Sequence, residues 1–377
     1  MRDPFCSSRY FPELNEWPSC YPKKVTPVKI GEMPKKVTLK FLSERLGLSK
    51  SAISSVLNNA PLARTFASET RERIFKAAEE YNYKPNYFAR YLNHRRSYLI
   101  GVLAPDLAEG YSAGVLVGIE QHLLQSDYHF FLASHEWSQT RIERTIELFM
   151  ERGVDGIILI NTPLSSEVDL PLAVIGKADT VDRGISISID NHAGIRLALE
   201  HLVSLGHQNI AFIKGHKDSA DTEDRWDAVL AAARSFSIKV DPKLVVQLER
   251  LGAQQLSAIE EGARCAGQLL SRRRGFTALM AFNDISAIGA INRFRERGWR
   301  IPQDLSVVGF DDVVAARVVY PALTTVQQPL RLIGEAAARE VINAITNGVK
   351  DQHLVLTPEL VIRQSTAPAS ATRSKRV

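Results

Sequence analysis

Cysteine is scarce in this chain of 377 residues, with only Cys6, Cys20 and Cys265, which stand far apart. So few and so scattered thiols exclude a disulfide framework and a cysteine-built metal site. The sequence also lacks an apolar run long enough to cross a membrane, and residues 1–32 lack the apolar core of a signal peptide. We therefore predict a protein of the reducing cytoplasm that acts without a membrane, a metal or a cofactor.

Several enzyme motifs are missing as well. We expect no Walker loop, no G-x-S-x-G nucleophile elbow, no HExxH and no G-x-G-x-x-G after the first predicted strand. A lone histidine such as His207, after Leu205 and Gly206, fits a loop anchor better than a catalytic group. The sequence thus predicts a binding protein and not an enzyme.

Residues 37–83 carry the spacing of three short helices. Leu39, Leu42 and Leu46 recur at helical intervals before Gly47, which suits a tight turn between helices. Ser49 then suits the N-cap of a second helix, and a third helix is predicted to begin near Ser68, as its N-cap. Two helices joined by a glycine turn indicate a helix-turn-helix, whose second helix enters the major groove of DNA.

Charge supports a nucleic-acid partner for this segment. Residues 33–98 hold 13 lysines and arginines against 5 acidic residues, whereas the residues after 98 carry a net charge of −4. A basic head on a mildly acidic body fits binding to the phosphate backbone of DNA. A plain three-helix bundle with a solvated basic face remains the alternative.

The residues that follow carry a second signature, Tyr-Lys-Pro-Asn-Tyr-Phe-Ala-Arg-Tyr-Leu over residues 83–92. Together with the helix-turn-helix it resembles the DNA-binding head of the lactose-repressor (LacI-type) family of bacterial transcription regulators. The resemblance implies that Leu92 is a wedge inserted between base pairs in the minor groove; an ordinary core leucine is the alternative. It implies minor-groove contacts from the hinge residues Asn86, Ala89, Arg90 and Leu92.

The second helix departs from the family pattern. Ser54 and Ser55 stand where relatives usually have Ser-Arg, so an arginine that could pair with guanine is missing. The residues expected at the major groove and the DNA backbone are Thr38, Ser49, Lys50, Ser51, Ser54, Ser55 and Asn58.

From Tyr98 onward, apolar strands alternate with amphipathic helices, which indicates parallel sheets with crossover helices. The alternation runs through two blocks, so the predicted fold is an all-α head followed by an α/β body of two doubly wound parallel sheets. This body resembles the family's periplasmic-binding-protein-like domain. The predicted domains are 1–32, a disordered leader or a misassigned start with Met33 as the initiator; 33–84, the helix-turn-helix; 85–97, the hinge and linker; and 98–366, the body, with lobes at 98–190 plus 328–350 and 191–326 plus 352–366.

Polar residues gather where the predicted strands end, which is where open parallel sheets bind ligands. The resemblance implies an effector cleft between the lobes, with a sugar or sugar derivative as the expected ligand, and an aspartate there could instead be a helix cap. Lys177, in place of a family Arg, hints at an anionic group on the ligand. The residues expected at the cleft are Asp106, Tyr111, Ser134, Arg225, Asn283, Asp311 and Gln328.

The predicted function is a regulator, most simply a repressor, that binds a palindromic operator in double-stranded DNA as a homodimer under control of a small molecule. Residues 367–377 are small and polar, so we expect a disordered tail and no tetramerising coil. A solute-binding protein with the same two lobes is the rival class, although the basic head and the missing signal peptide argue against it. An orphan regulator without an effector is the other alternative.

Overall fold

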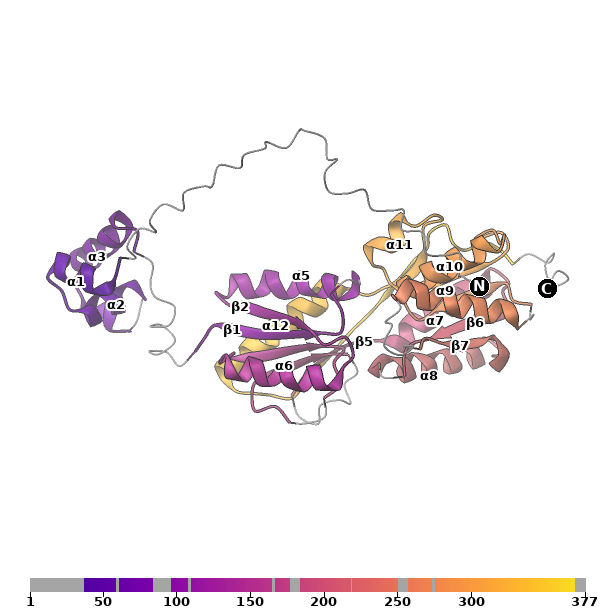
Figure 1. The fold of residues 1–377 in the computed structure, drawn as a ribbon, viewed down its shortest axis with the longest axis horizontal. Coiled ribbons are helices and arrows are strands. Elements are labelled where there is room, and N and C mark those ends of the chain that lie inside the picture. Colours follow the sequence, from indigo (N-terminus) through magenta and orange to yellow (C-terminus); the bar gives the residue numbers. More distant parts are fainter. Residues whose placement is uncertain are drawn as a thin grey trace, which may run out of the picture. The chain divides into compact units, whose positions relative to one another are not determined.

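The computed structural model describes residues 37–58, 61–83, 96–107, 110–164, 167–176, 184–217, 219–249, 257–272 and 275–369. The chain divides into two compact units, Met1–Asn93 and His94–Val377 (Figure 1). Residues 1–32, the predicted leader, and Asn86, Ala89, Arg90 and Leu92 of the predicted hinge lie outside the described residues.

The head contains the helices α1 (Leu39–Leu46), α2 (Lys50–Leu57) and α3 (Ser68–Glu80), with a 3-10 turn at Pro61–Thr65 before α3. Thr38 caps α1 with its hydroxyl, and Ser49 caps α2 by accepting a hydrogen bond from the Ala52 amide at 3.1 Å. Gly47 lies between these helices with φ at +68°, a backbone conformation that costs glycine little. The helix-turn-helix predicted from the sequence is therefore present.

One cap prediction is wrong. The third helix begins at Ser68 as expected, but its N-cap is Ala67, which offers no side-chain hydrogen bond. Ser68 is the first helical residue, and its hydroxyl lies 3.5 Å from the carboxylate of Glu72. The helix is held instead by its buried face, where Ile74 and Ala77 pack against Leu42 and Ile53.

The first lobe of the body is a parallel sheet with the strand order β11-β5-β4-β3-β1-β2. Helices α5 and α12 cover one face of this sheet and α6 covers the other (Figure 1). Its elements are β1 (Leu99–Ala104), α5 (Gly110–Gln125), β2 (His129–Ser134), α6 (Gln139–Glu151), β3 (Gly156–Ile160), β4 (Leu172–Ile175), β5 (Ile185–Ile189), α12 (Leu330–Asn347) and β11 (Gln352–Leu356).

The second lobe has the strand order β12-β10-β9-β8-β6-β7, and all of its pairs are parallel except that of β12 with β10. Helices α7 and α8 pack on one face, and α9 and α10 pack on the other. Its elements are α7 (Asn191–Ser204), β6 (Ile210–Lys214), α8 (Ala220–Ser235), η3 (Pro242–Leu244), β7 (Val245–Gln247), α9 (Ala258–Ser271), β8 (Ala278–Ala281), α10 (Asp284–Glu296), β9 (Ser306–Asp311), α11 (Val314–Val318), β10 (Thr324–Gln327) and β12 (Glu359–Val361).

The chain crosses between the lobes three times: after β5, after β10, and between β11 and β12. The sequence-based assignment of residues 352–366 to the second lobe is therefore wrong for β11, which pairs with β5 in the first sheet. The cause is that β11 alternates half-buried and exposed residues, a pattern that fits an edge of either sheet.

The helix pairs of both lobes pack backbone to backbone through glycine. A Cβ atom on Gly334 of α12 would lie 2.0 Å from the carbonyl oxygen of Val115 in α5, and one on Gly118 would meet the carbonyl oxygen of Arg331. In the second lobe, Gly262 of α9 and Gly289 of α10 stand in the same reciprocal relation, against Ser286 and Ile259. Each lobe therefore depends on the absence of a side chain at its central helix contact.

The expectation of a disordered tail from residue 367 is wrong for its first residues. The carbonyl oxygen of Ala367 hydrogen-bonds with the buried Ser306 hydroxyl at 3.1 Å and with His207 at 3.0 Å, and the Ala369 amide donates to Leu205. His207 is thus a structural anchor between the second sheet and the chain end. Over the residues that the structure describes, no helix combines the length and the apolar character needed to span a membrane.

Candidate functional site

The head presents one polar face on α2 and its cap. Ser49, Lys50 and Ser51 are exposed and Thr38 is exposed beside α1, whereas Ser54, Ser55 and Asn58 are half-buried. The Asn58 amide is engaged within the helix, donating to the Ser54 carbonyl oxygen at 2.8 Å and to its hydroxyl at 3.1 Å. The groups of α2 most open to a partner are therefore at its N-terminal end.

The body contains a cavity of about 150 Å³ lined by both lobes. The first lobe contributes the segment after β1, the start of α5, the loop after β2 and the end of β3. The second lobe contributes α8, α9, the segments after β6 and β7, and the ends of β8 and β9. Its lining residues are Pro105, Asp106, Tyr111, Ser112, Glu136, Trp137, Asn161, His216, Ser219, Asp221, Arg225, Leu248, Ala258, Glu261, Phe282, Asn283 and Asp311.

Five of the seven residues proposed for the cleft line this cavity: Asp106, Tyr111, Arg225, Asn283 and Asp311. The other two, Ser134 and Gln328, do not line it. Gln328 is buried behind the wall, where its amide donates to Asp311 Oδ1 at 2.7 Å. It can therefore orient Asp311 without touching a ligand.

Arg225 is the central cation of the cavity. Its Nε donates to Asn191 Oδ1 at 3.0 Å and its Nη1 to the Phe282 carbonyl oxygen at 2.9 Å. The guanidinium carbon lies 4.6 Å from the ring centroid of Phe282 and 4.0 Å from that of Phe310. These contacts fix the plane of the guanidinium, which suits a forked hydrogen bond to a ligand.

Asp311 ends β9 with φ at +120°, and Asp312 follows at +57°, so two successive non-glycine residues occupy sparsely populated backbone conformations. The turn is held by Asp312, which binds Arg317 and the Gln327 amide, at 2.9 and 2.7 Å. Such strain is often found at ligand sites. Burial raises the pKa of Asp311 well above its usual range, although the neighbouring Arg225 lowers it.

Beneath this turn, Asp284 is fully buried at the start of α10. It accepts hydrogen bonds from the Thr325 hydroxyl at 2.5 Å and the Val313 amide at 2.9 Å. Burial raises the pKa of Asp284 to about 7 despite these bonds. Asn283, one residue earlier, caps the same helix, because its Oδ1 accepts from the Ser286 amide at 2.9 Å. Asp284 and Asn283 thus both hold the wall of the cavity in place.

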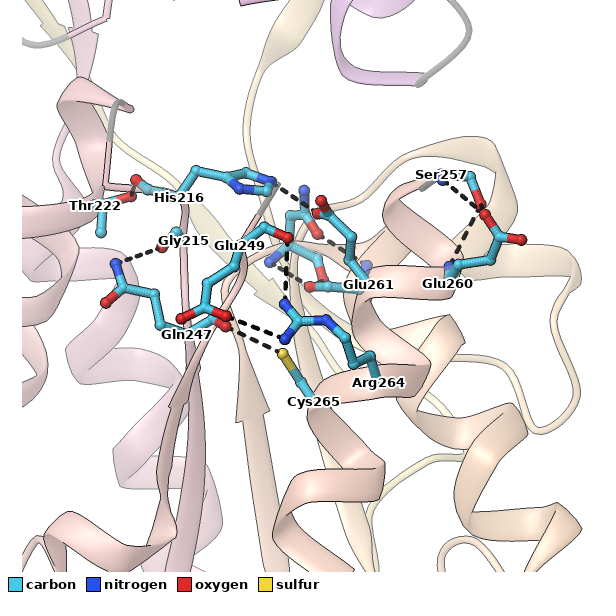
Figure 2. Close-up of polar contacts among 12 residues, drawn as sticks. Gly215, His216, Thr222, Gln247, Glu249, Ser257, Glu260, Glu261, Arg264 and Cys265 are labelled. Atoms are coloured by element: carbon cyan, nitrogen blue, oxygen red, sulfur yellow. Dashed lines mark hydrogen bonds and ion pairs between the residues drawn. The ribbon is translucent and has the colours of Figure 1, made fainter. Parts of the chain in front are cut away.

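His216 and Glu261 form a second polar group in the cavity wall, and Figure 2 shows the imidazole pointing toward the carboxylate of α9. His216 Nε2 lies 2.9 Å from Glu261 Oε2, and the Glu261 side chain is almost fully buried. The Thr222 hydroxyl donates to the His216 carbonyl oxygen at 2.7 Å and ties this loop to α8. The Glu261 carboxylate is therefore matched by a group from its own lobe.

Comparison with known proteins identifies the architecture. The model of bacterial regulatory proteins of the lacI family matches residues 38–86, and that of the periplasmic binding protein-like domain matches residues 199–366. The HTH-type transcriptional regulator DegA of Bacillus subtilis is 30% identical over 345 residues, which are 88% of this chain and 99% of DegA. The chain belongs to the lacI family of bacterial regulatory proteins.

Solved structures agree with this lacI-family assignment. The lac repressor dimer bound to operator and the anti-inducer ONPF superposes with a TM-score of 0.76 at 27% identity, covering 88% of this chain and 100% of that one. The complex of the transcriptional regulator CelR with cellobiose gives a TM-score of 0.65 at 26% identity, covering 87% and 99%. The predictions of a DNA-binding transcriptional regulator, and of a protein that is not an enzyme, are confirmed by this membership.

One enzyme-like pattern in this lacI-family chain was overlooked in the sequence: residues 110–114 read Gly-Tyr-Ser-Ala-Gly, which matches G-x-S-x-G. A nucleophilic serine of that motif stands on a sharp turn between strand and helix, beside a histidine. Ser112 instead lies buried within the first turn of α5. Within the described residues, no histidine hydrogen-bonds to it, so the pattern is helical packing beside the cleft.

Other cleft residues of this lacI-family member were also missed. Asp221 precedes Arg225 by one helical turn, a spacing visible in the sequence that is common for surface ion pairs. Glu261 lies on α9, a helix that the sequence reading did not assign. Trp137 follows β2 with φ at +59°, and the buried His135 accepts a hydrogen bond from the Trp137 amide at 3.0 Å. A tryptophan just past a strand end was the signal that could have revealed it.

Proposed function

We propose that this lacI-family protein is a repressor that binds a palindromic operator as a homodimer, and that a small molecule in the interlobe cavity controls its operator affinity. The observation that carries the proposal is that one chain joins a helix-turn-helix to a cavity in which Arg225 is buried and oriented. A protein that only transported a solute would have no use for the head. The site of action would be the cytoplasm, on the nucleoid.

At the operator, the N-terminal end of α2 would enter the major groove. Lys50 would contact phosphate or guanine, and the hydroxyls of Ser49 and Ser51 would hydrogen-bond to base edges or to the backbone. Thr38, Ser54, Ser55 and Asn58 are assigned to supporting contacts. The hinge residues Asn86, Ala89, Arg90 and Leu92, by resemblance to the family, would open the central minor groove.

In the cleft, a sugar or sugar derivative is the proposed effector. The Trp137 indole offers an apolar face for a sugar ring, Arg225 can donate to two oxygens at once, and Asp311 can accept from a hydroxyl. The CelR complex with cellobiose, which has the same fold, supports this class of ligand. Asp106, Tyr111 and Asn283 are proposed contacts, and Gln328 and Ser134 are proposed to act from behind the wall.

The effector would act by changing the angle between the lobes, and with it the separation of the two hinges in the dimer. A coupling of about 1 to 3 kcal/mol between the two sites corresponds to roughly a 5- to 150-fold change in operator affinity. Because the linkage is reciprocal, operator DNA would change the affinity for the effector by the same factor.

Selection of bound duplexes from a random DNA library tests the proposal. We expect a palindrome with a pyrimidine-purine step at its centre, because such steps kink easily. Leu92→Ala should weaken specific binding and bending while sparing ligand binding, and Lys50→Ala should lower the salt dependence of DNA binding by about one phosphate contact. No enriched sequence, together with tight binding of a small molecule, would favour a solute-binding role instead.

A further inference from the structure

The charges of the residues that line the cavity indicate which charge its ligand would carry. Carboxylates outnumber cations: Arg225 is the one lysine or arginine among the described lining residues, beside five acidic side chains. Two of those five are matched elsewhere, since Glu261 lies against His216 (Figure 2) and Glu136 forms an ion pair with Arg141 at 2.6 Å. The five acidic residues are Asp106, Glu136, Asp221, Glu261 and Asp311.

Arg225 does not satisfy the two carboxylates beside it. Its guanidinium donates hydrogen bonds to Asn191 and to the Phe282 carbonyl oxygen. Its Nη2 lies 3.9 Å from Asp221 Oδ2, which is too long for a hydrogen bond. One guanidinium therefore faces two buried carboxylates, Asp221 and Asp311. Full ionisation of both would leave one negative charge uncompensated, which agrees with the raised pKa of Asp311 in the absence of a ligand.

Asp221 is the less satisfied of the two carboxylates. Its side chain is 9% exposed, yet it lines the cavity from the first turn of α8. Among the described residues, no donor hydrogen-bonds to its oxygens, whereas Asp311 at least receives the Gln328 amide. A carboxylate so far removed from water costs free energy unless a donor or a cation reaches it.

Tyr111 brings the other lobe to the same place. Burial, followed by the charges of Asp221 and Asp311, raises the pKa of the Tyr111 phenol. The phenol, in the first turn of α5 of the first lobe, lines the same cavity as both carboxylates of the second lobe. These three side chains therefore present oxygen atoms to the cavity that Arg225 also lines.

We propose that the natural effector carries a protonated amine, which binds to Asp221 between Tyr111 and Asp311 while the ligand's hydroxyls reach Arg225. This inference rests on the proposed function and narrows its ligand to an amino sugar or a similarly hydroxylated amine. A phosphorylated or acidic ligand would add negative charge to a site that already has an excess. From Lys177, which lies outside the described residues, the sequence predicts an anionic group on the ligand. The lining of the described cleft favours a cationic group instead.

Matched pairs of ligands test the proposal by calorimetry on the full-length protein. Glucosamine, galactosamine and mannosamine are compared with glucose, galactose and mannose, and with glucose 6-phosphate. We expect one amine to bind at least about 10-fold tighter than its neutral parent, and that preference to vanish in Asp221→Asn. The matched control is Asp227→Asn, which removes the same charge from an exposed position of the same helix and should keep the preference.

A thermal measurement without ligand provides a second readout. Because the Asp221 carboxylate is buried and receives no hydrogen bond from the described residues, Asp221→Asn should raise the melting temperature at pH 7.5 by about 2 °C or more, and Asp227→Asn should not. A neutral or phosphorylated sugar that binds tighter than its amine overturns the proposal. If no compound binds, the melting temperatures decide. An increase in the melting temperature of Asp221→Asn supports the proposal, and a decrease or no change overturns it. Failure of the proposed function would be seen in a different experiment, as the absence of an enriched operator sequence in the selection from the DNA library.

Discussion

The first lobe offers the cavity the phenol of Tyr111, the indole of Trp137 and the amide of Asn161, and its carboxylates there, Asp106 and Glu136, are partly or fully exposed. The second lobe offers buried charges, among them Arg225 and Asp311. Both lobes are sheets covered by helices on two faces, so the difference lies in the side chains that line the cavity. We infer from this difference that the second lobe would hold the polar part of a ligand and that the first would close over it.

The largest expected effect on the difference between the lobes comes from Arg225→Ala. Loss of the guanidinium removes the charged donors of the second lobe and leaves Asp221 and Asp311 without a cation. We expect effector affinity to fall by roughly 100-fold or more, measured by calorimetry, because hydrogen bonds to charged groups are each worth about 1.5–3 kcal/mol. Operator binding without effector should persist.

Arg234→Ala is the matched control for that experiment, since it removes an exposed arginine from the last turn of the same helix. Its effector affinity should equal that of the parent protein. An Arg225→Ala variant that keeps its response to effector would show that the buried charge of the second lobe serves packing alone.

Substitutions at the glycine contacts between helices compare how much each lobe depends on close helix packing. Gly334→Ala in the first lobe and Gly262→Ala in the second each place a Cβ within about 2 Å of a backbone oxygen. We expect each change to destabilise its lobe by about 1–3 kcal/mol, since the helices must move apart, as followed by denaturant unfolding. Gly267→Ala on α9, where the nearest atom would be 3.8 Å away, is the control and should be neutral or slightly stabilising.

Removing the indole tests the closing role of the first lobe. Trp137→Ala should weaken effector binding by roughly 10-fold, because an apolar platform is lost while the charged contacts of the second lobe remain. Trp137→Phe should recover most of that loss. Equal affinities for the parent and the alanine variant would remove Trp137 from the site.

The last prediction concerns the slope of stability with pH. The pKa of Asp284 in the folded protein, about 7, lies above the ordinary value of an unfolded aspartate, so the folded state binds the extra proton between about pH 4 and 7. The stability that this residue contributes is therefore largest near pH 4 and falls as the pH rises toward 7. Asp284→Asn should cost most at the acidic end, and its cost should shrink by at most about 1.4 kcal/mol per pH unit.

Unfolding of the parent and of the Asp284→Asn variant across that pH range provides the measurement. Trp226 and Trp299 report on the second lobe and Trp137 on the first. A difference between the two proteins that stays constant with pH would mean that Asp284 does not gain a proton in the folded state.

Local pattern predicted the regular elements well. The strand His129–Ser134 and the start of the third helix at Ser68 follow directly from apolar spacing and composition. Strand β11 was misplaced because its membership depends on which sheet edge is free, which is a property of the whole fold. Asp221 was missed for a similar reason: beside Arg225 on a helix it is typical of an ordinary ion pair, and its burial depends on the packing of the whole fold.

The three crossings between the lobes also bear on synthesis of the protein. A chain that emerges from the ribosome cannot complete its first sheet until the edge strand Gln352–Leu356 has appeared, nor its second until Glu359–Val361 has followed. Both lobes therefore stay unfinished until almost the whole chain has been made, and they finish together. The helix-turn-helix, complete by residue 83, can fold long before the body that controls it.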